Sequence, residues 1–350
     1  MSHYSFLDRL LHRAALQVVP LAEMAFDIDQ KAVAKPDGLV SMERHVFVSG
    51  LARAGTTILM RRFYATGAFC SLTYRDMPFV LAPNIWRKAT RLSKQDAIAE
   101  ERAHGDRIMV DFDSPESLDE VFWRIFDGDS YIAKTHLAPH VPDDDLKKKF
   151  ASYVNAIIQA NDGQRTRYLS KNNNNILRLR AIRSMFPNAI IVVPFRHPIA
   201  HAGSLLRQHI KFVETQTDDR FVLSYMSWLG HHEFGLGHRP FRFGPQGTAT
   251  TAENNRNQIA YWLELWRQTY EWLEQSAPAD AIFVSYEDLC QDTAVWTRIA
   301  ELAGLDASSG ADEPFRQSDV AVEADTDSDL ARRALDVHGR LMARARASLR

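Results

Sequence analysis

The sequence predicts an α/β fold in which helices cover both faces of a mostly parallel sheet, giving three layers. Four short apolar segments have the length and composition of buried strands, and segments with helical periodicity lie between them. The clearest segment is a continuous run of isoleucine and valine at 190–193, as expected for a strand that is covered on both faces. The predicted strands are residues 45–49, 168–170, 189–195 and 281–285.

Helices are expected between these strands. A helix over 56–66 follows the first strand directly, and an amphipathic pattern over 259–273 precedes the fourth. Apolar residues also recur at helical spacing before the third strand, at Ile176, Leu179, Ile182 and Phe186. Regular alternation of strands and helices is typical of a parallel sheet, so this order supports the fold class.

The pattern divides the chain into one main domain and three smaller parts. We expect an N-terminal helical segment at 1–44 and an α/β domain at 45–305, with a largely helical insertion at about 83–164. Residues 231–251 are rich in His, Gly and Pro and predict a long loop. An acidic linker at 306–329 and a basic helix at 330–350 follow, the helix docked on the domain with its arginines in water.

Composition limits the function classes. The chain has 350 residues, 45% of them hydrophobic and 25% charged, with a formal net charge of −2. These values are ordinary for a globular enzyme and give no general attraction to nucleic acid or anionic membranes. The two cysteines, Cys70 and Cys290, form neither a disulfide framework nor a metal cluster, and no apolar run is long enough to span a membrane. We therefore expect a cytoplasmic protein.

The strongest functional signal is the loop that joins the first strand to the first helix. Its small residues turn backbone N–H groups toward one point at a helix N-terminus, where anions bind. Thr56 and Thr57 add hydroxyls, and Arg53 adds a guanidinium suited to phosphate or sulfate oxygens. The spacing is that of the ATP-binding P-loop, but Thr56 stands where that motif has its lysine.

A second anchor follows the third predicted strand. This strand ends at Arg196, and Pro198 is suited to the first turn of the next helix. Ser204 then lies about two helical turns further on, close to the same face as the helix start. An arginine and a hydroxyl together suit a phosphate group.

These two strand–helix junctions resemble the nucleotide-binding segments of the sulfotransferases that use 3′-phosphoadenosine-5′-phosphosulfate (PAPS). The loop resembles the Arg form found in tyrosylprotein sulfotransferases and many bacterial members, with Ala54 in place of the usual serine. The resemblance implies an α/β sulfotransferase that moves a sulfuryl group from PAPS to an acceptor hydroxyl, with 3′-phosphoadenosine-5′-phosphate (PAP) as product and no metal required.

The resemblance also implies roles for single residues. Arg196 and Ser204 would hold the 3′-phosphate, Tyr286 would contact adenine, and Lys171 would stabilise charge on the sulfuryl group. The residues implied to bind the 5′-phosphosulfate are Arg53, Ala54, Gly55, Thr56 and Thr57.

Two residues compete for the role of the general base that the acceptor hydroxyl needs. His136, in Lys134-Thr135-His136-Leu137, resembles the histidine of cytosolic sulfotransferases. Asp76 lies just beyond the phosphate-loop helix, where the Arg-type enzymes have a catalytic carboxylate, and we favour it. The histidines at 231–238 lack the spacing of a zinc motif and are interpreted as part of a substrate-facing loop.

Other function classes stay open at this point. A P-loop kinase acting on a nucleoside or sugar would share the strand–loop–helix, although the missing lysine argues against it. A non-catalytic nucleotide-binding module would keep both anchors. We expect the acceptor to be a carbohydrate hydroxyl, with a peptide tyrosine or a small alcohol still open. The sequence does not indicate the oligomeric state.

Overall fold

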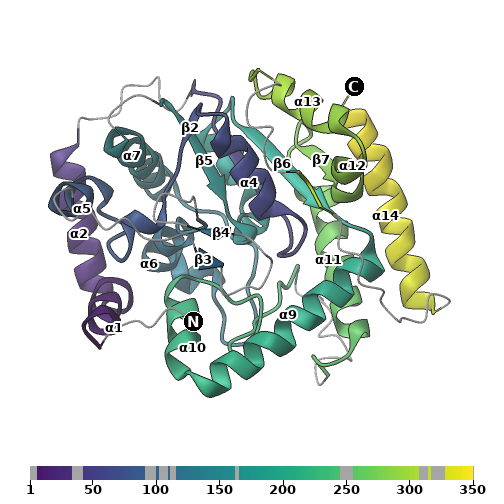
Figure 1. Cartoon of the computed structure of the whole chain (residues 1–350), viewed down its shortest axis with the longest axis horizontal. Coiled ribbons are helices and arrows are strands. Elements are labelled where there is room, and N and C mark those ends of the chain that lie inside the picture. Colours follow the sequence, from purple (N-terminus) through teal and green to yellow (C-terminus); the bar gives the residue numbers. More distant parts are fainter. Residues whose placement is uncertain are drawn as a thin grey trace.

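A computed structural model of the chain describes residues 6–33, 42–90, 100–101, 109–110, 116–161, 165–244, 255–306, 314–316 and 328–349. At its centre is a five-stranded sheet in the order β2-β5-β1-β6-β7 (Figure 1), in which every neighbouring pair is parallel. The strands are β1 (Val46–Val48), β2 (Phe69–Cys70), β5 (Arg167–Lys171), β6 (Ile190–Phe195) and β7 (Ile282–Ser285). Four of these strands confirm predicted ones. The fifth, β2, has two residues, too few to show a periodicity in the sequence.

Side chains of the strands alternate between two apolar cores, one on each face of the sheet. Val46 and Val48 pack with α4 (Thr56–Ala65) and α13 (Thr293–Leu302) on one face. Phe47 points to the other face, which carries the larger core. This core is formed with helices from residues 120–131, 144–160, 179–185, 198–218, 259–276 and 329–348. A helical layer on each face of a parallel sheet confirms the predicted three-layer α/β fold.

The helices that cover the sheet come from the whole length of the chain. Between residues 83 and 164 the described structure has three helices and one antiparallel strand pair, so this stretch is largely helical, as predicted. The elements not yet given are α1 (Phe6–His12), the π-helix η1 (Arg13–Gln17), α2 (Val19–Ala32), the 3₁₀ turn η2 (Tyr74–Asp76), α5 (Pro83–Thr90), β3 (Glu100–Glu101), β4 (Met109–Val110), α6 (Glu120–Tyr131), α7 (Asp144–Ala160), the 3₁₀ turn η3 (Asn173–Leu177), α8 (Leu179–Met185), α9 (Pro198–Asp218), α10 (Arg220–Trp228), α11 (Ile259–Ser276), α12 (Tyr286–Gln291) and α14 (Asp329–Ser348).

The C-terminal helix α14 docks along α11 and β7 at one edge of the molecule (Figure 1). Its buried residues recur every three or four positions, which is the stripe of an amphipathic helix; they are Ala331, Ala334, Val337, Leu341 and Ala345. Not all its arginines lie in water. The Arg344 guanidinium donates to the carbonyls of Glu274 and Pro278 and lies 4.1 Å from the centre of the Phe283 ring.

Two predicted connecting segments are described in part. Residues 231–244 form no helix or strand, and the rest of the predicted loop at 245–251 lies outside the described residues. Within the predicted acidic linker, Phe315 packs near Trp296 and close to the Arg62 guanidinium. Among the helices that the structure describes, none is both long and apolar enough to cross a membrane.

The order of the strands determines where a ligand can bind. In the sheet, β5 lies on one side of β1 and β6 lies on the other, so the direction of the strand order changes at β1. In open α/β sheets, ligands bind at such a point, outside the carboxyl ends of the strands. Here that point lies at the loop after β1, next to the ends of β5 and β6.

Candidate active site

The loop from β1 to α4 depends on two glycines. Gly55 has φ +88°, and a Cβ there would lie 2.3 Å from the ring of Tyr286. At Gly50 a Cβ would lie 2.7 Å from the carbonyl oxygen of Pro194 in β6. Both positions therefore need a residue without a side chain, which explains why this close turn has glycine at each of them.

The start of α4 leaves backbone donors available. Gly55 is the N-cap residue, and no side chain caps the helix. The first N–H groups of a helix lack partners within the helix, and the helix dipole makes them attractive to anions. Thr56 is buried in this first turn and Thr57 is half-buried beside it. Ala54, in the loop itself, is also buried. The predicted 5′-phosphosulfate residues thus line a single turn.

Arg53 holds an uncommon backbone conformation. Its φ of 70° lies in the left-handed region, which residues with a side chain rarely adopt and which costs free energy unless the surroundings enforce it. Arg53 Nε lies 3.4 Å from Ser204 Oγ on α9. The Arg53 carbonyl accepts a hydrogen bond of 3.2 Å from Arg196 Nη1 at the end of β6. The fold therefore brings the two predicted anchors together.

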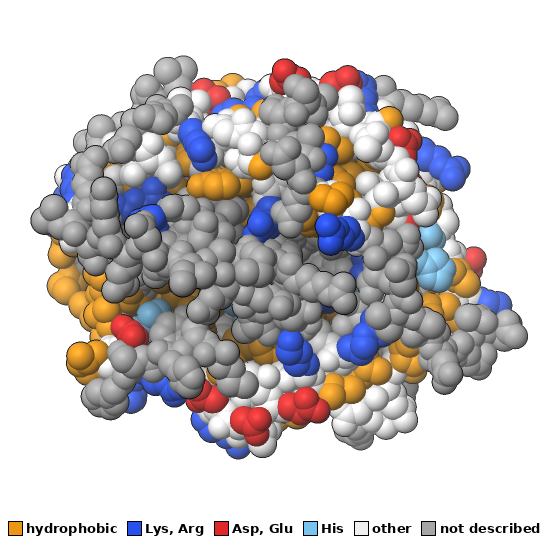
Figure 2. Space-filling view, viewed as in Figure 1, with side chains coloured by type: hydrophobic (Ala, Val, Ile, Leu, Met, Phe, Trp, Pro, Cys, Tyr) orange, Lys and Arg blue, Asp and Glu red, His pale blue; other side chains and the backbone are white. Residues whose placement is uncertain are grey.

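The Arg53–Arg196 pair is rich in positive charge. The carboxylate nearest to Arg196 belongs to Glu287, whose Oε1 is 3.8 Å from Arg196 Nε. Burial and the charge of Arg196 lower the pKa of Arg207, three residues beyond Ser204 on α9, so a third guanidinium influences this region. Figure 2 shows basic side chains, in blue, around the middle of one face, whereas acidic ones, in red, lie mainly near its edges.

A histidine that the sequence did not single out supports the loop from below. His201 on α9 is fully buried; its Nε2–H donates to the Ala52 carbonyl at 2.8 Å, and its Nδ1 accepts from Trp266 at 3.1 Å. Burial, together with the charges of Arg196 and Arg53, lowers the pKa of His201 to about 3. The ring is therefore neutral and holds the loop by hydrogen bonds alone. No local motif in the sequence marks this residue.

Tyr286 lies between the phosphate loop and Arg196 and contacts both. Its ring packs under Gly55, and the Arg196 guanidinium lies 5.5 Å from the ring centre. Its hydroxyl donates to the Arg316 carbonyl at 3.0 Å. The contact with the loop and with Arg196 is direct, whereas the predicted contact with adenine stays a prediction.

The end of β5 carries a chain of polar contacts into the loop. Lys171 is buried at the last position of β5 and pairs in register with Val48 of β1. Two residues later, Asn173 accepts a long hydrogen bond of 3.4 Å from Thr56 Oγ1 and donates to Glu233 Oε1 at 3.0 Å. Thr56 is thus linked through Asn173 to Glu233, which the sequence analysis did not place near the loop.

Glu233 is a carboxylate with an unusual environment. Its side chain is 15% exposed, and its Oε2 lies 3.5 Å from Nδ1 of His231. Burial would raise the pKa of Glu233, but His231 and the charge of Lys171 outweigh that effect and hold it well below its usual value. Glu233 is therefore ionised at neutral pH. It lies close to Lys171 and is linked to Thr56 of the phosphate loop through one residue, Asn173.

The asparagine run after β5 caps the next turn and links three parts of the molecule. Asn172 accepts a hydrogen bond from the N–H of Asn174 and so caps η3. Its own Nδ2 donates to Glu120 at 2.7 Å. Asn173 points to Glu233, and Asn174 donates to the Gly230 carbonyl at 2.9 Å. The run therefore joins the sheet, the α6 side of the core and the loop after α10.

Asp76, the first candidate base, is fully buried in an ion pair. Its two oxygens accept from Arg87 Nε at 2.6 Å and Arg87 Nη2 at 2.7 Å. The backbone N–H of Thr73 donates a third hydrogen bond at 2.8 Å, in a capping box for η2. Each oxygen thus accepts from Arg87, and no hydrogen bond of the described residues joins Asp76 to the phosphate loop.

His136, the second candidate base, is half-buried in the segment between α6 and α7. Its Nδ1 lies 3.1 Å from Thr135 Oγ1. The next residue, Leu137, donates its N–H to the Pro240 carbonyl at 2.9 Å and lines the same small cavity as Leu51 of the phosphate loop. The structure therefore brings this segment to the loop region, although the two are far apart in sequence.

The histidine-rich segment forms hydrogen bonds rather than a metal-like cluster. His238 Nε2 lies 2.8 Å from the Tyr261 hydroxyl, and its Nδ1 lies 3.1 Å from the His232 carbonyl. Over the part of the chain that the structure describes, no group of three or more His, Cys, Asp or Glu residues could hold a metal ion.

The sequence also matches a known family over most of this region. The profile of the sulfotransferase family matches residues 45–309, which include both anchors and all the strands of the central sheet. The chain belongs to the sulfotransferase family. Sulfuryl transfer is therefore its reaction class, and the two arginine anchors lie within the matched region. No curated protein matches the chain.

Solved sulfotransferase structures are similar to this chain at low identity. STF1 from Mycobacterium tuberculosis is 16% identical with a TM-score of 0.41, covering 98% of this chain and 86% of that one. STF9 from Mycobacterium avium is 14% identical with a TM-score of 0.38, covering 95% and 73%. The sulfotransferase domain of the Synechococcus PCC 7002 olefin synthase is 13% identical with a TM-score of 0.39, covering 89% and 98%. At these values the structures support no conclusion about donor, acceptor or single residues.

Proposed function

We propose that this sulfotransferase moves a sulfuryl group from PAPS to a hydroxyl of a carbohydrate. The observation that carries the proposal is the meeting of Arg53, Arg196 and Ser204 at the loop after β1. Arg53 and Ser204 are linked at 3.4 Å, and Arg196 donates to the Arg53 backbone at 3.2 Å. Two guanidiniums and a hydroxyl beside an uncapped helix start suit a ligand with two separate anionic groups.

The residues present fit PAPS. Ser49 Oγ and Arg196 Nε are buried and have no hydrogen-bond partner among the described residues. Buried polar atoms are normally paired, and phosphate oxygens are strong acceptors for both of these donors. We assign Arg196 and Ser204 to the 3′-phosphate. The loop with Arg53, Ala54, Gly55, Thr56 and Thr57 is assigned to the 5′-phosphosulfate, and the Tyr286 ring to the adenosine side.

Bound PAPS would supply an activated sulfuryl group on a phosphate leaving group. The acceptor oxygen forms a bond to sulfur while the bond between sulfur and the 5′-phosphate oxygen breaks. Arg53 and the N–H groups at the start of α4 stabilise the charge that develops on the leaving oxygen. Lys171, at the end of β5, stabilises the oxygens of the group in transit. These protein donors replace the metal ion that a P-loop kinase uses, so we expect no metal requirement.

The acceptor hydroxyl must lose a proton, and three residues are candidates to accept it. The sequence indicates Asp76 and His136, and the contacts of the loop add Glu233. Asp76 already accepts from Arg87 through both oxygens, whereas Glu233 is ionised and linked to Thr56 through Asn173. In a loose transition state the substrate hydroxyl keeps its proton until late. A fixed side chain that accepts a hydrogen bond from this hydroxyl and orients it therefore contributes more to the rate than a strong base does. We therefore prefer Glu233, with His136 as the alternative.

A cytoplasmic location is part of the proposal. Cys70 and Cys290 are free thiols, and burial raises the pKa of Cys70 to about 12, which makes this thiol unreactive. Free thiols are typical of a reducing compartment.

The proposal is tested by a transfer assay with radiolabelled PAPS in EDTA. The purified protein is incubated with a panel of neutral and acidic sugars, and labelled product is counted beside PAP release. We expect metal-independent transfer to at least one sugar. Magnesium-dependent phosphate transfer from ATP, with no sulfate transfer and no PAP release, would instead establish the kinase alternative and overturn the proposal.

A further inference from the structure

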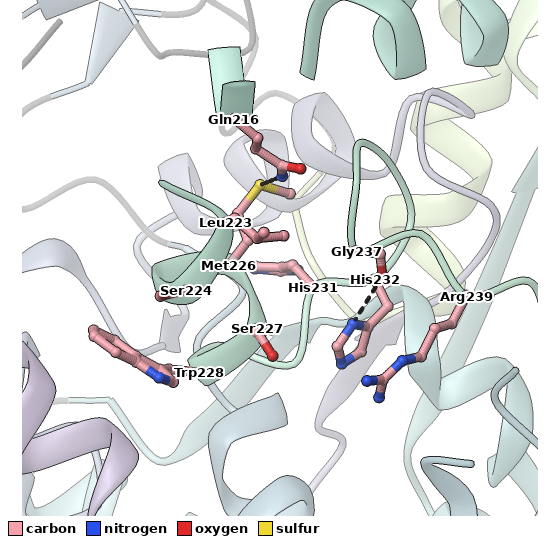
Figure 3. A pocket seen from close by; sticks show the side chains of 10 residues that line it. All are labelled: Gln216, Leu223, Ser224, Met226, Ser227, Trp228, His231, His232, Gly237 and Arg239. Atoms are coloured by element: carbon pink, nitrogen blue, oxygen red, sulfur yellow. Dashed lines mark hydrogen bonds between the residues drawn. The ribbon is translucent and has the colours of Figure 1, made fainter. Parts of the chain in front are cut away.

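A cavity of about 270 Å³ lies between α10 and the segment that follows it. Figure 3 shows Leu223, Ser224 and Ser227 of α10 on one side and His232 with Arg239 on the other. Ligand pockets usually measure about 300–1,000 Å³, so this cavity is at the small end and suits a single sugar unit. None of the residues assigned to PAPS lines it.

Arg239 makes this cavity chemically specific. The side chain is half-buried, and among the described residues no carboxylate or carbonyl pairs with it. Partial burial lowers the pKa of Arg239. Its charge also acts with burial to lower the pKa of His232 to about 4. A desolvated guanidinium of this kind is stabilised by an anionic ligand.

The remaining walls are suited to hydroxyl groups. His232 is neutral at pH 7 and donates from Nδ1 to the Gly237 carbonyl at 3.3 Å, which leaves Nε2 as a hydrogen-bond acceptor. Ser224 and Ser227 can donate or accept, and Trp228 adds an aromatic ring to the lining. Polar acceptors and donors beside one guanidinium match a hydroxylated acid better than a neutral lipid or an aromatic ring.

A short series of side-chain contacts links the lining of this cavity to the phosphate loop. His231 lines the cavity and lies 3.5 Å from Glu233. Glu233 accepts from Asn173 at 3.0 Å, and Asn173 accepts from Thr56 at 3.4 Å. Arg239 also lines a second, smaller cavity together with Glu233 and Leu51 of the loop, so a ligand anchored at Arg239 would lie beside Glu233 and the loop.

We propose that this cavity is the acceptor site and that the acceptor is a sugar acid, whose anionic group binds Arg239 while a hydroxyl lies near Glu233. This proposal rests on the proposed function, because it assigns the acceptor of the same transfer. It narrows the acceptor from carbohydrates in general to those that carry a carboxylate beside free hydroxyls.

Matched ligands and matched variants test the site. Binding of methyl β-D-glucuronide and of methyl β-D-glucoside, which differ in one carboxylate, is measured by calorimetry with and without PAP. The variants are Arg239→Gln, Arg239→Lys and, as control, Arg220→Gln, an exposed arginine at the start of α10 outside the cavity lining. Circular dichroism confirms that each variant is folded.

We expect the wild-type protein and Arg220→Gln to bind the glucuronide at least 10-fold more tightly than the glucoside. This preference disappears in Arg239→Gln and returns in part in Arg239→Lys. Equal affinity for both ligands in the wild-type protein, or a preference that survives in Arg239→Gln, would overturn the proposal. The PAP titration on the same samples shows separately whether the nucleotide site, and with it the proposed function, fails.

Discussion

Two buried groups of charges in this molecule differ in how completely they are paired. On the α6 side of the sheet, Arg178 donates to both oxygens of Glu120 at 2.9 and 3.0 Å, and these side chains are 0% and 1% exposed. Tyr131 and Asn172 donate to the same carboxylate. Every oxygen of Glu120 thus has its partners inside the protein.

At the loop after β1 the balance is different. Arg53 and Arg196 lie close together, yet the carboxylate nearest to Arg196, that of Glu287, is 3.8 Å away. Nε of Arg178 and Nε of Arg196 are both buried without a hydrogen-bond partner among the described residues, so the two groups differ in how closely a carboxylate meets each guanidinium. Paired charges of the first kind hold the fold, whereas charges of the second kind cost stability and are kept where a ligand pairs with them.

The comparison separates the candidate bases as well. Asp76, with its two hydrogen bonds from Arg87, resembles the paired Glu120. Glu233 accepts one hydrogen bond from Asn173, has His231 at 3.5 Å, and remains 15% exposed beside the loop. Asp76 therefore has the contacts of a structural carboxylate, and Glu233 those of a group that can also reach a ligand.

The largest effect is expected from breaking the paired group. Arg178→Met leaves the Glu120 carboxylate buried without its cation, and we expect a loss of about 3–5 kcal/mol in the free energy of unfolding. Urea denaturation measures it. Arg332→Met, which removes an arginine from an exposed pair on α14, should cost about 0–1 kcal/mol. Similar losses for both variants would contradict the structural role of the Glu120–Arg178 pair.

A smaller effect, on a different property, is expected at the candidate bases. Glu233→Gln should lower kcat at least ~10-fold, equivalent to about 1.4 kcal/mol, while the melting temperature and the PAP affinity stay close to wild type. Asp76→Asn should lower the free energy of unfolding by about 1–3 kcal/mol and leave kcat of the folded fraction within a few-fold. Loss of turnover in a folded and stable Asp76→Asn protein would contradict the structural role of Asp76.

The smallest expected change is in the pH profile. Because His231 and Lys171 outweigh burial and hold the pKa of Glu233 well below its usual value, this carboxylate stays ionised as the pH falls from 8 to 5. kcat should then be nearly constant over this range in the wild-type protein. An imidazole base of ordinary pKa, about 6.5, would become protonated and kcat would fall as the pH decreases, which would favour His136 instead.

The sequence predicted the features that depend on neighbouring residues. Gly50, Gly55 and Thr56 form a motif within a few positions, so the strand–loop–helix could be recognised directly. The four longer strands had enough apolar residues to show a pattern. Local propensity and spacing suffice for such elements.

The features that the sequence did not predict depend on residues far apart in the chain. His201 meets Ala52, and Asn173 meets Glu233, only after α9 and the loop beyond α10 have folded against the sheet. The same holds for Asp76, since nothing in the sequence shows that Arg87 takes both its oxygens. Tertiary packing, which single-sequence patterns do not contain, decides these roles.

The central claim is most directly tested by calorimetric titration of PAP in EDTA. Wild-type protein, Arg196→Gln, Ser204→Ala and the surface control Arg332→Gln are compared at equal concentration. We expect micromolar, metal-independent binding that is weakened at least ~10-fold in Arg196→Gln, less in Ser204→Ala, and not at all in the control. Absence of PAP binding in a folded wild-type protein, or equal affinity in Arg196→Gln, would contradict the assignment of this arginine pair to the nucleotide.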